Sequence, residues 1–189
     1  DELLALDPQN SVLHEVGPEP LPGTVKVEHM FPMRSLDKGT NDDDITHFVT
    51  QSTFGGTRFL AQPKLDGSAL SLEYVAGNLH RAATRGSGER GEDVTLNAKQ
   101  IANIPLRLNV AVDCHVRGEV VMPLAVFDEK YRDVSPNPRN LCSGALRQKH
   151  GDGKADAADL VFCAYDVKFV NDAPCLLYTS DAADDHHRV

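Results

Sequence analysis

One lysine stands in a segment whose composition suits covalent chemistry. The stretch "AQPKLDGSALSLEY", residues 61 to 74, places Lys64, Asp66 and Gly67 together between two runs in which apolar and polar residues alternate. A lysine amine becomes a nucleophile when burial or nearby positive charge keeps it partly unprotonated. Residues two apart in an extended chain face the same side, so Lys64 and Asp66 can share a pocket, and Gly67 leaves room for a ligand. A surface lysine–aspartate pair at a turn would also fit these residues.

Three further segments contain residue types that are suited to binding phosphate or ribose. "ATRGSGERGEDVT" places Arg85 at the mouth of a glycine-rich loop, whose backbone amides can cradle an anion. "RGEV" places Glu119 among apolar residues, where a carboxylate needs an ion pair, a metal ion or a ribose hydroxyl. "NPRNLCSGALRQ" places Arg139 and Arg147 around a turn of small residues. Each segment has a structural alternative, such as a solvated hairpin or an ion pair of Glu119 with Arg117 or Arg147. The combination therefore carries the functional interpretation.

The strands that must position these groups are marked by alternating apolar residues. Period-two alternation over residues 70–75 predicts a half-buried strand, "AGN" at 76–78 a hairpin turn, and "LHRAATR" the returning strand. Further strands are expected over residues 58–63, over "HVRGEVVM" and over "DLVFCAYDVKFV". The glycine-rich "GSGERGED" between them is expected to be a loop.

Helices are expected between the strands. They are predicted over "DVTLNAKQIANI", over "PLAVFDEKYRD" and at the end of "SPNPRNLCSGALRQ". An earlier short helix, capped by Asn41 or Asp42, would carry apolar residues on one face: Ile45, Phe48 and Val49. This mixture of hairpins and helices predicts an α+β fold with antiparallel sheets and helices packed outside.

Composition limits the classes of protein that fit. The chain has 189 residues, of which 41% are hydrophobic and 25% charged, as in an ordinary globular domain. No apolar run approaches the roughly 20 residues that span a bilayer, and "DELLALDPQN" lacks the basic start of a signal peptide, so a cytoplasmic location is expected. The net charge of −9 argues against a broad basic face that grips DNA. The four cysteines form no CxxC pair, which favours buried thiols over a zinc site.

The motifs resemble a known family when they are taken in order. "HMFPMRSLDK", "PKLDG", "AATRGSGERGEDVT", "IPLRL", "VRGEV", "NPRN", "GALRQ" and "FCAYDV" follow one another as in bacterial NAD-dependent DNA ligases, over roughly residues 24 to 168. The resemblance implies a nucleotidyltransferase (ATP-grasp-like) fold whose C-terminal part is missing. The "KxDG" motif alone is shared with ATP-dependent ligases and capping enzymes.

The resemblance implies a role for each matching residue. Lys64 would attack the adenylyl phosphorus of NAD, release nicotinamide mononucleotide (NMN) and form lysyl-AMP, and Asp66 would orient the lysine. AMP would then pass to the 5′-phosphate of a DNA nick. The adenylate pocket would be formed by five matching residues: Ser35, Leu36, Gln62, Arg85 and Glu119. Basic contacts near the nucleotide and the nicked strand would come from Arg139 and Arg147.

Cofactors and partners follow from the same resemblance. NAD would be the substrate and Mg²⁺ the metal ion, with zinc expected only in a separate domain. Nicked double-stranded DNA would be bound mainly through other domains, and a monomer without membrane contact is expected. Two positions depart from the family: Gln62 stands where the family has glutamate, and Ser87 where it has aspartate.

The resemblance also suggests a division of the chain. Residues 1–20 are interpreted as a remnant of an N-terminal helical NMN-binding piece with a linker, and residues 21–174 as a truncated adenylation domain. Residues 175–189 resemble a translated sequencing adapter, and a natural acidic tail is the alternative. The family's later "DGVVIK"-type strand is not found in the sequence, so weak or absent activity of this chain is expected. An ATP- or GTP-dependent nucleotidyltransferase and a non-catalytic nucleotide-binding module stay open as alternatives.

Overall fold

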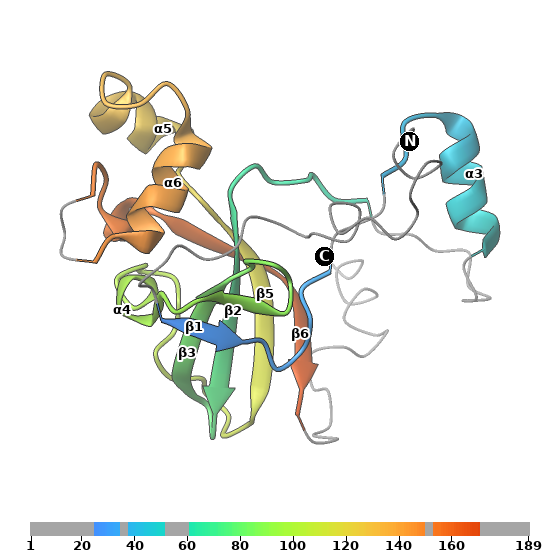
Figure 1. Cartoon of the computed structure of the whole chain (residues 1–189), viewed down its shortest axis with the longest axis horizontal. Helices are drawn as coiled ribbons and strands as arrows, with labels where there is room; N and C mark the ends of the chain where they lie inside the picture. The colour runs from blue at the N-terminus through green and yellow to red at the C-terminus, as the bar shows by residue number, and fades with distance from the viewer. Residues whose placement is uncertain (1–24, 35–37, 52–60, 150–152, 171–189) are drawn as a thin grey trace, which may run out of the picture.

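The structure, a computed structural model, describes residues 25–34, 38–51, 61–149 and 153–170. It contains a four-stranded antiparallel sheet in the order β3-β2-β5-β6 and a two-stranded antiparallel ribbon, β1-β4 (Figure 1). The strands are β1 (Lys26–Glu28), β2 (Ser68–Val75), β3 (Asn78–Thr84), β4 (Arg90–Glu92), β5 (Cys114–Val121) and β6 (Val161–Phe169). The helical segments are α3 (Asp42–Gln51), α4 (Thr95–Ala98), α5 (Leu124–Val126), the π-helical turn η1 (Phe127–Tyr131), α6 (Pro138–Arg147) and the 3-10 turn η2 (Ala157–Asp159). The predicted α+β class with antiparallel sheets is confirmed.

The β2–β3 hairpin follows its sequence pattern closely. Leu70, Leu72 and Tyr74 are buried on one face of β2, as period-two alternation requires. The turn runs through Ala76 and Gly77, whose φ angles of 47° and 77° lie in the left-handed region. Two left-handed residues give this turn the twist that joins antiparallel neighbours, and glycine adopts such a backbone without strain. The predicted strands and hairpin turn are confirmed, but β2 is not half-buried as expected, because Ser71 and Glu73 on its other face are buried too.

The hydrophobic core lies between one face of the sheet and the helices α4 and α6. Helix α6 begins at Pro138, and Asn137 caps it by accepting a hydrogen bond from Arg139 N at 2.8 Å. One face of α6 is buried against β2 and β5 through Leu141, Cys142, Ala145 and Leu146. The sheet and this helix together hold the "NPRN" turn next to the start of β2, where Arg139 bonds Asp66.

The cysteines behave as predicted where the structure describes them. Cys114 and Cys142 are free, buried thiols, and Cys163 is half-buried on β6. The Cys142 Sγ donates a hydrogen bond to Val120 O at 3.1 Å, and burial raises the pKa of this thiol to about 12. Cys175 lies outside the described residues.

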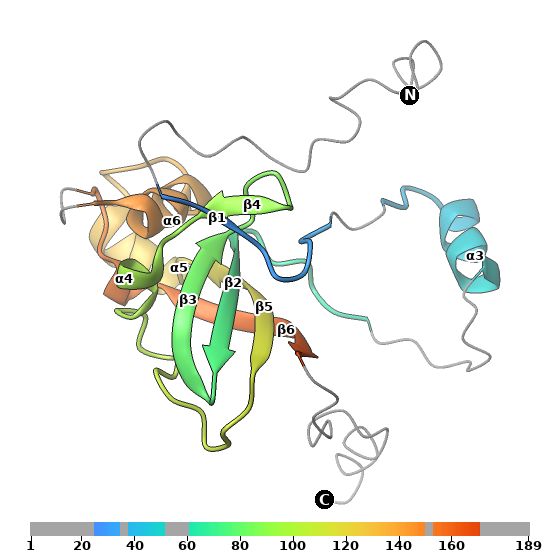
Figure 2. The same cartoon turned by 60° about the horizontal axis from the view of Figure 1, so that its bottom comes forward.

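Two predicted elements differ from the structure. Residues 61–63 form no strand, and residues 58–60 lie outside the described ranges. The glycine-rich segment predicted to be a loop contains β4, which pairs with β1 in the register Val27↔Gly91. Glycine is required there because a Cβ atom at position 91 would lie 1.8 Å from the carbonyl oxygen of Thr84. This long-range pairing places the ribbon at the end of the sheet where β3 stops (Figure 2).

The helix predicted over "DVTLNAKQIANI" is limited to α4. Beyond Ala98 the chain continues in tight turns, with Ile101 N donating to Ala98 O at 3.2 Å and Ile104 N donating to Ile101 O at 3.0 Å. These turns still bury both isoleucines in the core. The predicted strands β5 and β6 and the helical segments α5–η1 and α6 are confirmed.

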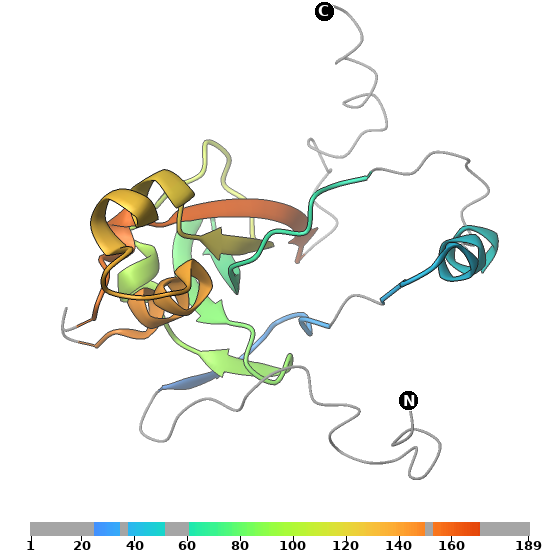
Figure 3. The ribbon, with the colours of Figure 1, turned by 90° about the horizontal axis from the view of Figure 1, so that it is seen from above.

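Helix α3 forms where the sequence predicts a short helix. Asn41 is its cap, because Asn41 Oδ1 accepts a hydrogen bond from Asp44 N at 2.9 Å. Its apolar residues Ile45 and Phe48 are exposed, and Figure 3 shows α3 apart from the sheet. None of the helices in the described ranges has the length and apolar character needed to cross a membrane.

Candidate active site

The candidate site lies on the face of the sheet opposite the helical core. Alternate side chains of β2 and β5 point to this face, and the pairs Ala69↔Glu119 and Ser71↔Arg117 place them side by side. A hydrogen bond from Arg85 N to Ala69 O, 3.3 Å long, brings the end of β3 to the same place. Two predicted site residues, Arg85 and Glu119, therefore flank Ala69.

Gly67 joins the lysine-bearing segment to this face. A Cβ atom at this position would lie 2.1 Å from Val120 O and 2.8 Å from Val121 Cγ1, so glycine is needed for the chain to approach β5. The Gly67 amide donates a hydrogen bond to Glu119. The glycine of the "KLDG" motif thus fixes the start of β2 against the carboxylate.

Glu119 is the electrostatic centre of the site. Burial raises the pKa of its carboxyl group, and three positive side chains, from Lys64, Arg139 and Arg85, act in the opposite direction. The same Gly67 hydrogen bond also favours the ionised form. Three cations predicted from separate motifs therefore come close enough to Glu119 to interact with it. This half-buried carboxylate beside three cations suits a ligand that carries both hydroxyl and phosphate groups.

Lys64 is exposed, contrary to the expected burial between two strands. The reason is local, because residues 61–67 form no strand and so do not enclose the side chain. Asp66 bonds Arg139 Nη1 at 3.0 Å, with both side chains more than half exposed, instead of binding the lysine ammonium. An exposed ion pair adds little stability, so its effect here is to hold Arg139 beside the lysine segment. Gln62 is exposed in the same segment.

Two amides of the glycine-rich turn after Arg85 donate hydrogen bonds within the turn. Gly88 N donates to Arg85 O and Ser87 N donates to Arg90 O, both at 3.0 Å. Gly86 and Gly88 have φ angles of 53° and 96°, which glycine adopts without strain. The amides of Ser87 and Gly88 are therefore engaged within the turn, and anion binding by the other amides of this loop stays a prediction.

Arg147 lies in a different environment from the other predicted arginines. Its Nε is 2.9 Å from an oxygen of Glu92, whose side chain is 3% exposed. This ion pair connects α6 with β4 and places a positive charge beside a buried carboxylate. The expected alternative partners of Glu119 are likewise engaged elsewhere, since Arg117 Nη1 is 3.7 Å from Asp166 Oδ2.

Tyr165 belongs to the site although the sequence pattern gave it only a place in a strand. It lies on β6 beside the irregular pairing at Arg117 and Gly118, and its side chain is exposed. Burial raises the pKa of its hydroxyl group, with a further contribution from Glu119, and Arg85 acts in the opposite direction. An exposed aromatic ring within the field of Glu119 offers a flat surface for a ring-shaped ligand group. In the sequence, Tyr165 stands in a largely apolar run, so its pattern indicated only a strand residue.

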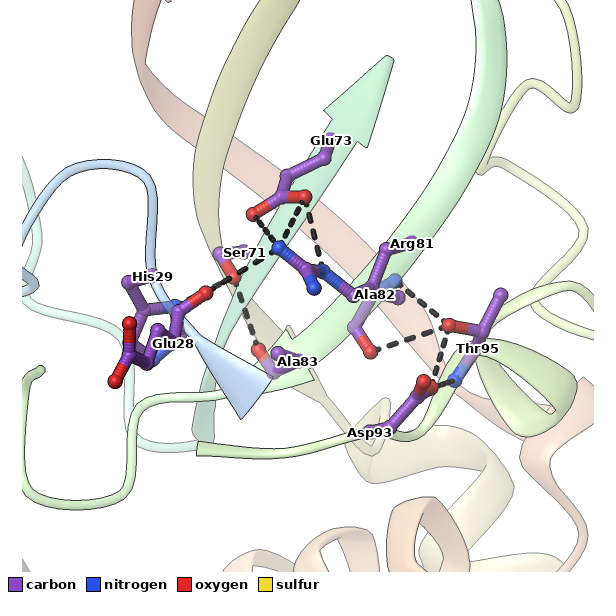
Figure 4. Close-up of polar contacts among 9 residues, drawn as sticks. All are labelled: Glu28, His29, Ser71, Glu73, Arg81, Ala82, Ala83, Asp93 and Thr95. Carbon is purple, nitrogen blue, oxygen red and sulfur yellow. Dashed lines mark hydrogen bonds and ion pairs between the residues drawn. The ribbon is translucent and has the colours of Figure 1, made fainter. Parts of the chain in front are cut away.

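A polar network covers the rest of this face (Figure 4). The Arg81 guanidinium forms two hydrogen bonds of 2.9 Å with the buried Glu73 carboxylate, and its Nη2 also donates to Glu28 O at 3.2 Å. His29, the residue after β1, bonds Ser71 and the Arg85 backbone. No sequence motif indicated a role for these residues.

Ser35 and Leu36 lie outside the described residues. Within the described ranges, no three or more histidine, cysteine, aspartate or glutamate side chains are grouped so that they could hold a metal ion.

Comparison with known proteins agrees with the arrangement of these motifs. Residues 23–184 match the family described as NAD-dependent DNA ligase adenylation domain. A DNA ligase of Halothermothrix orenii is 41% identical over 169 residues, which cover 84% of this chain and 25% of the relative. A DNA ligase of Natronomonas pharaonis is 41% identical over 157 residues, which cover 73% of this chain and 22% of the relative. The chain thus spans about a quarter of the length of these curated relatives.

Proposed function

The chain belongs to the NAD-dependent DNA ligase adenylation domain family, and from this premise we propose that it binds NAD and accepts the adenylyl group on Lys64. The observation that carries the proposal is the convergence of Lys64, Arg85 and Arg139 on the Glu119 carboxylate. These groups come from four separate motifs, and together they match the charges and hydroxyls of a nucleotide.

The proposed reaction is a displacement at phosphorus. The Lys64 Nζ, after losing a proton, forms a bond to the adenylyl phosphorus, and the bond from that phosphorus to the bridging oxygen breaks. Nicotinamide mononucleotide leaves with the electron pair of that bond. Such transfers depend mainly on positioning and charge neutralisation. The exposure of Lys64 is consistent with a nucleophile that becomes enclosed by the substrate itself.

Each neighbouring group has a proposed part in positioning the nucleotide. Glu119 accepts a hydrogen bond from a ribose hydroxyl, while Arg85 and Arg139 neutralise phosphate oxygens. The Tyr165 ring provides a surface for the base, and the Gln62 amide reads the base edge through its oxygen. Asp66 keeps Arg139 in place through their ion pair.

Magnesium is included in the proposal because phosphoryl transfer requires charge neutralisation. Mg²⁺ is commonly held by one or two carboxylates together with substrate phosphates. Glu119, which interacts with the charge of Lys64, and Asp66, two residues after that lysine and paired with Arg139, supply carboxylates of this kind, and they would hold an ion that arrives with the nucleotide. Bound there, the ion would neutralise charge on the phosphates.

The later steps concern a whole ligase. We propose that AMP passes from Lys64 to the 5′-phosphate of a nick in double-stranded DNA, and that the 3′-hydroxyl then closes the strand. The curated relatives that this chain matches are named DNA ligases. A role of Arg147 near the nicked strand is still a prediction, alongside its contact with Glu92.

Intact-mass measurement after incubation with NAD tests the proposal. We expect a low but detectable yield of protein carrying one AMP, with no such product from ATP or GTP. Lys64→Ala should abolish the product, whereas Lys99→Ala, at an exposed lysine after α4, should leave it unchanged. An adduct that survives Lys64→Ala would refute the assignment, and an adduct formed equally well from ATP would favour an ATP-dependent transferase. Nucleotide binding without any adduct would favour a non-catalytic binding module.

A further inference from the structure

The segment that follows β1 is tied to the Arg85 turn by hydrogen bonds that the proposed reaction does not use. His29 N donates to Glu89 O at 2.8 Å, and Met33 N donates to Gly88 O at 2.7 Å. The pairing of β1 with β4 continues directly into these bonds. Residues 29–33 therefore lie against the turn that follows Arg85 and are bonded to it through their backbone.

The His29 side chain bridges this turn and the sheet. Its Nε2 is 3.1 Å from Arg85 O, its Nδ1 is 3.2 Å from Ser71 Oγ, and the residue is 8% exposed. A carbonyl oxygen can only accept, so Nε2 carries the hydrogen and Nδ1 of the neutral ring is an acceptor. The single Ser71 hydroxyl hydrogen is shared between this Nδ1 and Ala83 O, which lies 3.3 Å from Ser71 Oγ. Burial lowers the pKa of His29 from its ordinary value, which favours this neutral form at pH 7.

The bridge acts on a backbone position that borders the site. Ser71 and Ala69 lie on the same face of β2, and Ala69 pairs with Glu119 on β5. The Arg85 peptide is already attached to Ala69 through Arg85 N, at 3.3 Å. His29 adds a contact to the Arg85 carbonyl from the other side. Together the two contacts fix the position of the Arg85 Cα atom relative to Glu119.

We propose that His29 is a positioning residue: its imidazole clamps the Arg85 carbonyl to Ser71 and so holds the Arg85 guanidinium where it can meet the nucleotide phosphate. The consequence for ligand binding rests on the proposed function, whereas the clamp itself is a property of the folded chain. Among the contacts described for this turn, His29 makes the one side-chain hydrogen bond to the Arg85 backbone.

Two conservative variants separate the two ends of the imidazole. His29→Gln places an amide donor near the position of Nε2 and can keep the bond to Arg85 O. His29→Asn reaches only as far as Nδ1 and can keep the bond to Ser71 alone. If the bond to the Arg85 carbonyl is the end of the clamp that holds the arginine, His29→Gln should keep function and His29→Asn should lose it. Glu28→Gln is the matched control, because Glu28 is exposed and its side chain pairs with Arg90 at the surface.

Hydrogen exchange in the absence of nucleotide tests the clamp directly. With His29→Asn we expect peptides covering residues 85–91 to exchange at least several times faster, because the bonds Gly88 N to Arg85 O and Ser87 N to Arg90 O open more often. Peptides from β2 and β5 should be unchanged, and His29→Gln and Glu28→Gln should resemble the parent. Unchanged exchange over 85–91 in His29→Asn would overturn the clamp.

A double-mutant cycle with AMP as the probe tests the effect on the ligand. His29→Asn should weaken AMP binding about tenfold, and it should add less than about twofold in an Arg85→Ala background, because the histidine acts through the arginine. Independent, multiplying effects would overturn the positioning role and leave His29 a stabilising residue. A parent chain that binds no AMP would refute the proposed function and the positioning role with it, while the exchange data would still decide on the clamp.

Discussion

The buried imidazole of His115 should make the stability of this domain fall steeply between pH 7 and pH 5. His115 lies on β5, is 0% exposed and packs edge-on against Phe31, with ring centroids 5.7 Å apart. In the described part of the chain, neither ring nitrogen has a hydrogen-bond partner. Burial lowers the pKa of His115 from 6.5 to about 4, with a further contribution from Arg117 and partial opposition from Glu73.

The sign and size of the effect follow from proton linkage. The unfolded chain binds the proton more tightly, so the contribution of His115 is fully present above pH 6.5 and is lost as the pH falls toward 4. The full loss is about 3 kcal/mol at about 1.4 kcal/mol per pH unit. Roughly 2 kcal/mol of it is already lost at pH 5.

Urea unfolding of the parent and of His115→Phe at pH 7 and pH 5 measures this loss. Phenylalanine keeps a ring against Phe31 and cannot be protonated. The free energy of unfolding of the variant should therefore fall by about 2 kcal/mol less between the two pH values than that of the parent. The control is His80→Phe, at an exposed position on β3, which should keep the parent's difference. An equal difference in the parent and in His115→Phe would show that His115 is not a buried neutral base.

Three further predictions concern the site and its supporting hairpin. Gly67→Ala should lower the free energy of unfolding by about 1–3 kcal/mol and weaken AMP binding, because the new Cβ would lie 2.1 Å from Val120 O. Thermal melts and AMP titration measure the two effects, and unchanged AMP binding would contradict the close approach of Gly67 to β5. Ala76→Asn should raise the free energy of unfolding by about 0.5–1 kcal/mol, since asparagine tolerates the φ of 47° better than alanine, and an unchanged or lower melting temperature would argue against this turn. Glu119→Gln should raise the melting temperature slightly while weakening AMP binding about tenfold or more, because burial disfavours the charged group that binds the ribose; unchanged affinity would remove Glu119 from the pocket.

The sequence was informative wherever the signal is local. Alternation along 70–75 and the "AGN" turn specify the β2–β3 hairpin because each depends on neighbouring residues, and both are confirmed. The convergence of Lys64, Arg85 and Arg139 on Glu119 agrees with the grouping inferred from motifs.

Contacts between distant segments were not predictable from such patterns. The pairing of β1 with β4 depends on Gly91 lying against Thr84. A single glycine within a polar run predicts a loop, so the sequence carries no sign of this pairing. The bond between the "NPRN" helix and β4, made by Arg147 and Glu92, joins residues whose sequence surroundings give no sign of each other. His29 and Tyr165 acquire their places only when the sheet has formed. Burial of Lys64 was expected from two flanking strands, of which β2 is present and residues 61–63 form none.

A crystal structure of the chain with AMP bound would test the central claim most directly. We predict that the nucleotide lies on the polar face of the sheet, with its phosphate beside Lys64 Nζ and Arg85, and its ribose hydroxyls against Glu119. AMP bound at any other place, with Lys64 and Glu119 both out of contact with it, would contradict the proposed chemistry.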